Sequence, residues 1–213
     1  MESRLRQEII RVTRIVAGQG LVRSSDGNTS VRLGEGRFLI TPSGLYKMRL
    51  EADDLIVVDE RGQVIAGRPG LQPTSETLMH LEAYRQRPDI GAVLHAHPPY
   101  ATALTIAGIP FPVNLIPEVL LTCGDVPTAP YATPGTEDLA HSIGDLIREH
   151  DGVLLSHHGS LTVGKTLEEA LIALERIEHV AHTFFLARAL GEVRPLPAGE
   201  VARLRQIGQM LKS

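Results

Sequence analysis

Two short histidine motifs carry the most distinctive chemistry in this sequence. His95 and His97 end an apolar run in GAVLHAHPPY, and His157 and His158 end a second run in GVLLSHHG. Alternate residues of a strand point to the same face, so His95 and His97 project together. Two neutral imidazoles on one face can reach a divalent ion. If the second strand lies beside the first, one of its histidines completes a three-histidine site with an open position, the arrangement of catalytic zinc.

Three polar stretches precede the histidines and could bind phosphate. They are DGNTS, residues 26–30, TPSG, residues 41–44, and PTSE, residues 73–76. Backbone N–H groups in such turns, and at a helix N-terminus, bind phosphate without lysine or arginine. Beside a metal they suggest a small phosphorylated substrate. Glu76 follows directly and could be a general base next to the metal, although a glutamate at a helix start also needs no function.

The other five histidines are interpreted as packing or surface residues: His80, His141, His150, His179 and His182.

The elements that position these motifs alternate between helices and short strands. Apolar spacing and capping signals predict helices over residues 2–17, 76–87, 100–107, 136–149 and 166–190, with a short helix over 199–211. Alternation and turn residues predict strands over 28–33, 37–41, 55–59, 63–66, 91–97, 152–157 and 160–164. We expect 112–116 to be extended and 124–135 to be loop. Because several strands join through short hairpins, the prediction is one α/β domain, residues 1–213, with helices layered on a mixed or antiparallel sheet and a tail over 192–213.

The length, composition and net charge of the chain argue against several classes of protein. The chain has 213 residues, of which 43% are hydrophobic, and a net charge of -4, which suits one compact domain without a basic surface for nucleic acid. No apolar run reaches the roughly 18 residues of a membrane helix, and the charged N-terminus does not read as a signal peptide. The single cysteine, Cys123, fits a reducing compartment. We therefore expect a cytoplasmic protein without membrane or nucleic-acid partners.

An ordered set of motifs resembles the class II aldolase/adducin family, and within it the L-fuculose-1-phosphate aldolase type. The motifs are GNTSVR at 27–32, TPSG at 41–44, TSE at 74–76, HAH at 95–97, APYATPGT at 129–136 and HHG at 157–159. The likeness runs from about residue 5 to residue 190. It implies a three-layer α/β/α sandwich around a mixed, largely antiparallel sheet. It also implies a homotetramer with fourfold symmetry and active sites at the subunit interfaces.

The resemblance implies a role for each motif. Zinc, one ion per subunit, would be held by His95, His97 and His158, with His157 a neighbour; manganese or cobalt could also occupy such a site. Glu76 would be the catalytic acid/base. The implied phosphate site consists of Gly27, Asn28, Ser43, Gly44, Thr74 and Ser75. The implied reaction cleaves a 1-phosphoketose, such as fuculose 1-phosphate or a deoxypentulose phosphate, to dihydroxyacetone phosphate and an aldehyde.

Two departures from the family pattern leave the substrate open. The fuculose-phosphate type carries a tyrosine in the segment that here reads VNLIP, residues 113–117, and others near its C-terminus, whereas no tyrosine follows Tyr131 here. The group that protonates the aldehyde oxygen is thus unidentified. The related 4-epimerases place an aspartate in the stretch that reads LLTC here, residues 120–123, which argues against epimerisation. Apolar residues at 116–120 hint at a less polar aldehyde, or at interface packing.

Other functions remain open at this point. The same scaffold could support dehydration, decarboxylation or epimerisation of a sugar phosphate. A non-catalytic, adducin-like assembly module is a further alternative, but it predicts missing ligands, and His95, His97, His158 and Glu76 are all present.

Overall fold

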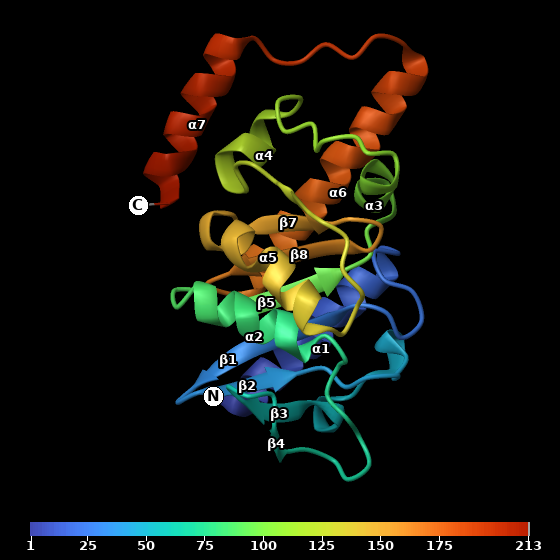
Figure 1. Ribbon diagram of the computed structural model, residues 1–213, viewed down its shortest axis with the longest axis vertical. Helices are drawn as coiled ribbons and strands as arrows, with labels where there is room; N and C mark the ends of the chain where they lie inside the picture. Colours follow the sequence, from blue (N-terminus) through green and yellow to red (C-terminus); the bar gives the residue numbers. More distant parts are fainter. Residues whose placement is uncertain (213) are drawn as a thin grey trace.

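An eight-stranded sheet runs through the middle of the computed structural model, which describes residues 1–212, with side chains as far as Met210 (Figure 1). The strands are β1 (Asn28–Gly34), β2 (Arg37–Ile40), β3 (Ile56–Asp59), β4 (Val64–Ala66), β5 (Ala92–Ala96), β6 (Thr128–Ala129), β7 (Gly152–Leu155) and β8 (Gly159–Gly164). Their spatial order is β4-β3-β2-β1-β5-β8-β7-β6. The β6–β7 pair is parallel and the other pairs are antiparallel, which confirms the mixed, largely antiparallel sheet.

Helices cover both faces of this sheet. They are α1 (Glu2–Gly18), α2 (Thr77–Gln86), α3 (Pro99–Ile106), α4 (Pro117–Thr122), α5 (Glu137–Glu149), α6 (Leu167–Leu190) and α7 (Ala198–Lys212). The helices α1 and α6 share one apolar core with one face of the sheet, and α2 and α5 share a second core with the other face. The predicted α/β/α sandwich is therefore confirmed. Among the helices that the structure describes, none is long and apolar enough to cross a membrane.

A third apolar core lies beyond the sheet, where α3 and α4 pack against α6. The end of α6 and the whole of α7 extend past the sheet, with α4 between them (Figure 1). The tail helix α7 packs on α4 so closely that a side chain at Gly208 would come within 3.0 Å of the Leu120 carbonyl oxygen. Arg205 of α7 also donates two hydrogen bonds to Asp125, at 2.6 and 2.7 Å. The tail is thus a packed element of the chain.

Two sequence predictions differ from the structure. Within the segment 112–116 that was expected to be extended, residues 113–115 form a turn and Val113 N–H donates to the Phe111 carbonyl at 2.9 Å, while Ile116 is extended and Pro117 begins α4. The predicted loop at 124–135 contains β6, whose two residues pair with β7. Such a short strand has no periodicity that a sequence could reveal.

Candidate functional site

Three histidines converge where the end of β5 meets the turn between β7 and β8. The Nε2 atoms of His95 and His97 lie 2.9 Å apart. The ring centroid of His158 lies 4.7 Å from that of His95 and 5.0 Å from that of His97. One nitrogen of each ring falls within 4.8 Å of the others, a spacing that could hold a metal ion. The structure thus brings together His95, His97 and His158, the histidine of the HHG motif that the family resemblance implied.

The route by which His158 reaches the cluster differs from the simplest expectation. Strand β7 does not lie beside β5, because β8 pairs with both and separates them. The histidine arrives instead through the turn: His157 adopts a left-handed conformation, with φ of 57°, and its side chain is exposed, while His158 turns inward. A side chain at Gly159 would collide with the Ala96 carbonyl oxygen and lie 2.9 Å from the His97 ring. Glycine at this position therefore lets the turn approach β5.

Burial keeps two of these imidazoles neutral. His95 is 0% exposed, and burial, followed by the nearby His97 and His158, holds its pKa well below the usual value. Burial and His158 also lower the pKa of His97. Nδ1 of His95 lies 2.9 Å from the Ser160 carbonyl oxygen, which can only accept, so Nδ1 carries the proton and Nε2 presents its lone pair to the cluster. This is the tautomer and outer hydrogen bond that metal-binding histidines adopt.

The donor set fits a divalent cation. Ligands at about 2.1 Å in a tetrahedral site stand about 3.4 Å from one another, roughly half an ångström more than the 2.9 Å between the Nε2 atoms of His95 and His97. One nitrogen from each of the three rings faces the same point, so a single ion could be shared among them. Imidazole ligands suit zinc and the neighbouring transition metals rather than magnesium or calcium.

Glu76 lies against the histidine cluster at the start of α2. Its side chain is almost fully buried, with Oε2 at 3.2 Å from His95 Nε2 and Oε1 at 3.3 Å from His158 Nε2. The Asn28 amide donates to Oε2 at 2.8 Å. Oε1 is also buried, and among the described residues it has no hydrogen-bond partner. One carboxylate oxygen is therefore anchored, and the other is available to a ligand at the cluster.

The three polar stretches that the sequence suggested for phosphate lie side by side. Residues 41–44 run between the other two: Thr41 N–H donates to the Thr29 carbonyl at 3.0 Å, and Thr74 N–H donates to the Thr41 carbonyl at 3.2 Å. Because the last stretch leads directly into Glu76, these turns adjoin the histidine cluster.

The residues predicted to bind phosphate differ in their exposure to solvent. Ser43, Gly44 and Ser75 are exposed, whereas Gly27, Asn28 and Thr74 are buried. The Asn28 side chain already holds two neighbours, because its Nδ2 donates to Glu76 and its Oδ1 lies 2.5 Å from His80 Nε2. Its second amide hydrogen and its backbone N–H are what Asn28 could still offer to a phosphate.

Two residues near the site were missed by sequence reasoning. His80 was interpreted as a packing residue, yet it is 0% exposed and hydrogen-bonded to the asparagine that holds Glu76. Lys47 is 2% exposed and lines a small cavity together with His95. Burial lowers the pKa of Lys47 to about 8, against the opposing charges of Asp26 and Glu76. The burial of Lys47 could not be predicted, because the sequence YKMR around it is typical of a solvent-exposed basic stretch.

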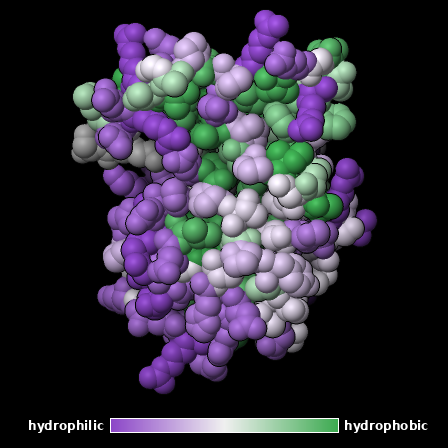
Figure 2. Space-filling model, turned by 45° about the horizontal axis from the view of Figure 1, so that its top comes forward, coloured by the Kyte–Doolittle hydropathy of each residue, from purple (hydrophilic) through white to green (hydrophobic). Residues whose placement is uncertain are grey.

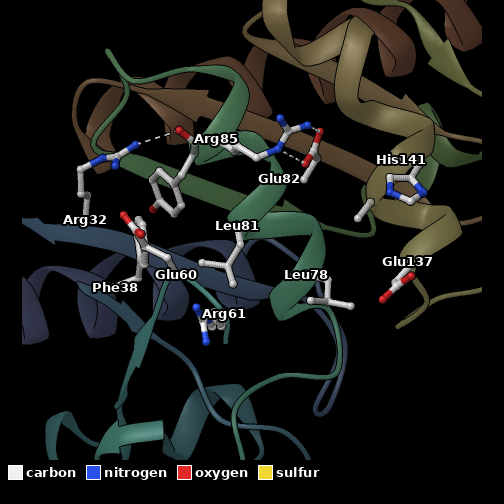
Figure 3. Close-up of a pocket in the computed structure, with 12 residues that line it drawn as sticks. Arg32, Phe38, Glu60, Arg61, Leu78, Leu81, Glu82, Arg85, Glu137 and His141 are labelled. Atoms are coloured by element: carbon white, nitrogen blue, oxygen red, sulfur yellow. Dashed lines mark hydrogen bonds and ion pairs between the residues drawn. The ribbon is translucent and has the colours of Figure 1, made fainter. Parts of the chain in front are cut away.

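A separate cavity of about 450 Å³ lies between α2, α5 and the sheet (Figure 3). Within it Arg85 forms a two-bond pair with Glu82, at 2.6 and 2.7 Å, and Arg32 donates to the Tyr84 carbonyl at 3.0 Å (Figure 3). Its walls include neither Glu76 nor the histidines of the cluster. This cavity is thus distinct from the candidate metal centre.

The apolar character of residues 116–120 suggested a less polar substrate, but two of these residues are buried inside the protein. Val119 is 0% exposed and Leu120 is 2% exposed, and Val119 belongs to the third core. These two side chains support packing of α4 and do not face a ligand.

The chain belongs to the class II aldolase and adducin family, since the model of the Class II Aldolase and Adducin N-terminal domain matches residues 7–185. A 5-methylthioribulose-1-phosphate/5-deoxyribulose-1-phosphate aldolase of Rhodospirillum rubrum is 34% identical over 200 residues, which cover 94% of this chain and 89% of that protein. A 3-oxo-tetronate 4-phosphate decarboxylase of Escherichia coli is 34% identical over 211 residues, 96% of this chain and 97% of that protein. A solved L-fuculose 1-phosphate aldolase superposes with a TM-score of 0.87 at 32% identity, covering 98% of this chain and 96% of that one.

The family expected from the sequence is therefore confirmed, and with it membership of a group of lyase-like, metal-dependent enzymes that act on sugar phosphates. An aldolase and a decarboxylase are equally similar to this chain. Family membership alone does not choose between their reactions.

We predict that replacing His95, His97 or His158 with Ala reduces bound zinc well below the level of about one ion per chain, because two imidazoles hold the ion much less tightly than three. Metal analysis of the purified variants measures this. His157→Ala is the matched control, since it removes an exposed histidine from the same turn, and it should keep the full zinc content. Equal zinc in His157→Ala and His158→Ala would contradict the assignment.

We predict that Lys47 makes stability rise with pH in alkaline solution. Between about pH 8 and pH 10.5 the folded chain releases the Lys47 proton while the unfolded chain retains it, so unfolding takes up a proton and its free energy increases. Lys47→Met should remove roughly 2–3 kcal/mol of this increase. Denaturant unfolding of both proteins across that range, at equal zinc loading, gives the comparison. Parallel pH profiles would show that Lys47 is not desolvated.

Proposed function

We propose that this protein is a metal-dependent class II aldolase that cleaves a 1-phosphoketose to dihydroxyacetone phosphate and an aldehyde. The observation that carries the proposal is the placement of the Glu76 carboxylate within 3.3 Å of two histidines of a three-histidine cluster. A cation site and a buried carboxylate in contact are what cleavage of a carbon–carbon bond next to a carbonyl requires, because charge and proton must be handled at adjacent atoms.

His95, His97 and His158 would hold the metal, and zinc is the ion that three imidazoles favour. When bound, it would supply a Lewis acid that stabilises negative charge on the ketone oxygen as the carbon–carbon bond breaks. The family is metal-dependent, which supports this assignment.

Glu76 would move the proton at the carbon that is left electron-rich. Its Oε1 is buried, lies 3.3 Å from His158 Nε2 and has no hydrogen-bond partner among the described residues, so it can accept or donate a proton toward a ligand at the cluster. Burial also excludes water, which strengthens the electrostatic interactions of the carboxylate with the substrate.

The polar turns around Gly27, Ser43, Gly44, Thr74 and Ser75 would bind the phosphate through backbone N–H groups and hydroxyls. Ser43 and Ser75 are exposed, and Ser75 immediately precedes Glu76, which supports this role. Phosphate held there would fix the reacting carbons relative to the carboxylate, and such orientation contributes a large part of a catalysed rate.

Decarboxylation of a phosphorylated 3-oxo acid is the second candidate. It is favoured by a relative as similar to this chain as the aldolase, the 3-oxo-tetronate 4-phosphate decarboxylase of Escherichia coli. Both reactions leave charge beside a carbonyl and need the same cation and proton donor. They differ in the bond that breaks, so their products distinguish them. Dehydration or epimerisation would involve the same groups, and the stretch LLTC at 120–123 argues against the latter.

A homotetramer with sites at the subunit interfaces is part of the proposal, as is a cytoplasmic location. Figure 2, with the α6–α7 end brought forward, shows apolar side chains gathered over that end, whereas the opposite end is largely hydrophilic. Exposed apolar residues from α3, α6 and α7 include Ile106, Phe185, Leu186, Leu190 and Met210. Apolar area of this kind is typical of surfaces that another chain covers, which supports assembly.

We predict that the zinc-loaded protein releases dihydroxyacetone phosphate from at least one member of a panel of 1-phosphoketoses. The measurement couples that product to NADH oxidation. Glu76→Gln should lower kcat by at least about 100-fold, because it removes the proton-transfer group. A chelator should abolish the signal, and His157→Ala should retain it.

Two results would contradict the proposal. One is a Glu76→Gln variant that stays within about tenfold of the parent rate, below what general acid–base groups contribute. The other is silence on every phosphoketose combined with carbon dioxide release from a phosphorylated 3-oxo acid, which would establish the decarboxylase.

A further inference from the structure

A buried chain of hydrogen bonds leads away from Glu76 through the interior. Asn28 Nδ2 lies 2.8 Å from Glu76 Oε2, and Asn28 Oδ1 lies 2.5 Å from His80 Nε2. His80 Nδ1 lies 2.7 Å from Ser30 Oγ, and that oxygen lies 3.0 Å from the Tyr84 hydroxyl. All five residues are at most 7% exposed. In the reaction proposed above, Glu76 is the member of this chain that transfers the proton.

The chain forms because a helix and a strand with matching spacings lie against each other. Glu76, His80 and Tyr84 are four residues apart along α2, a step of about 6 Å on one helix face. Asn28 and Ser30 are two residues apart along β1, a step of about 6.7 Å on one strand face. The two rows therefore stay in register, and the hydrogen bonds alternate between them from one end to the other.

The hydrogen bonds have a single consistent direction. Asn28 donates an amide hydrogen to Glu76 Oε2, so the other end of the amide, its carbonyl oxygen, accepts from His80, and His80 Nε2 must carry a proton. Burial, with His95 nearby, lowers the pKa of His80 to about 3, so the ring is neutral and its Nδ1 accepts from the Ser30 hydroxyl. Ser30 has then used its only proton and accepts from the Tyr84 hydroxyl.

We propose that His80 is a positioning residue for Glu76: its Nε2–H fixes the orientation of the Asn28 amide, which anchors Oε2 and leaves Oε1 directed at the histidine cluster. An inverted amide would set its oxygen against the carboxylate and its NH₂ against the Nε2–H of His80. The proposal rests on the proposed role of Glu76 in proton transfer. It gives the two oxygens of one carboxylate different tasks.

The outer end of the chain is closed by packing and not by solvent. The Tyr84 ring stacks on Phe38, with centroids 4.6 Å apart, and the Arg32 guanidinium lies 4.9 Å from the Tyr84 ring centroid. Arg32, which follows Asn28 and Ser30 on the same strand face, lines the cavity of Figure 3. This end holds the tyrosine hydroxyl toward Ser30, so the whole row is ordered from the cavity wall to the active site.

The first test is the protonation state of His80 in the zinc-loaded protein. Nitrogen-15 NMR of histidine-labelled protein distinguishes the two neutral tautomers and the charged ring, and His80→Gln identifies the signal by its loss. The expected result is the neutral Nε2–H tautomer across the neutral pH range. A neutral ring that carries its proton on Nδ1 would overturn the proposal, because Nε2 would then have no proton to donate to Asn28 Oδ1. A charged ring would keep that donor and would contradict only the direction assigned to the Ser30 hydroxyl. This readout is independent of which reaction the protein catalyses.

The second test separates positioning from packing. His80→Leu keeps an apolar side chain of similar size but offers no donor, and kcat should fall about 10- to 100-fold, as for outer partners of catalytic groups, with KM within about threefold. His80→Gln can still donate to Asn28 and should restore most of kcat. Met79→Ala is the matched control, because Met79 is 1% exposed on the same helix and its truncation affects packing alone.

The outcomes separate this proposal from the proposed function. Equal losses of kcat in His80→Leu and Met79→Ala, or no rescue by Gln, would overturn the positioning role. If the parent protein fails to cleave any phosphoketose, the aldolase proposal fails, and the tautomer of His80 still decides how Glu76 is held. If His80→Leu does not fold, the NMR result on the parent protein decides alone.

Discussion

The contact on which the rest of the structure depends is the approach of two imidazole nitrogens, His95 Nε2 and His97 Nε2, to 2.9 Å. The lone pair of His95 faces this contact, since its other nitrogen donates to the Ser160 carbonyl. The approach follows from strand geometry, because alternate residues share a face. The third histidine, His158, joins the other two because glycine at position 159 lets its turn pack tightly against Ala96. A cation shared by the three rings would stabilise this arrangement further.

The position of Glu76 beside this cluster depends on how α2 packs against β1. Its position is set by the register between α2 and β1, whose spacings of about 6 Å and 6.7 Å agree closely enough for two repeats. Buried polar groups are costly unless every partner is satisfied, and here each donor finds an acceptor in turn. A fully connected row of this kind limits the carboxylate to one orientation. The same burial lowers the pKa values of His80 and His95 and keeps both rings neutral.

Much of the fold could be predicted from the sequence, because its signals are local. The Thr166 cap, for example, accepts from Glu169 N–H and begins α6 as the TLEE pattern predicts. The grouping of His95, His97 and His158 could also be predicted, from strand alternation and family resemblance. Features that depend on how distant elements pack together could not be predicted. The insertion of β8 between β5 and β7, the burial of Lys47 and the Asn28–His80 hydrogen bond each depend on which elements pack together, and no local pattern reports that.

The central claim, that three histidines and Glu76 form one metal centre, is tested most directly by X-ray absorption at the zinc edge of the loaded protein. The account predicts three imidazole nitrogens at about 2.0–2.1 Å with additional light-atom scattering from oxygen, and two imidazoles at most in His158→Ala. A sulfur neighbour at about 2.3 Å would contradict it, because no cysteine belongs to the cluster among the described residues. So would a spectrum that His158→Ala leaves unchanged.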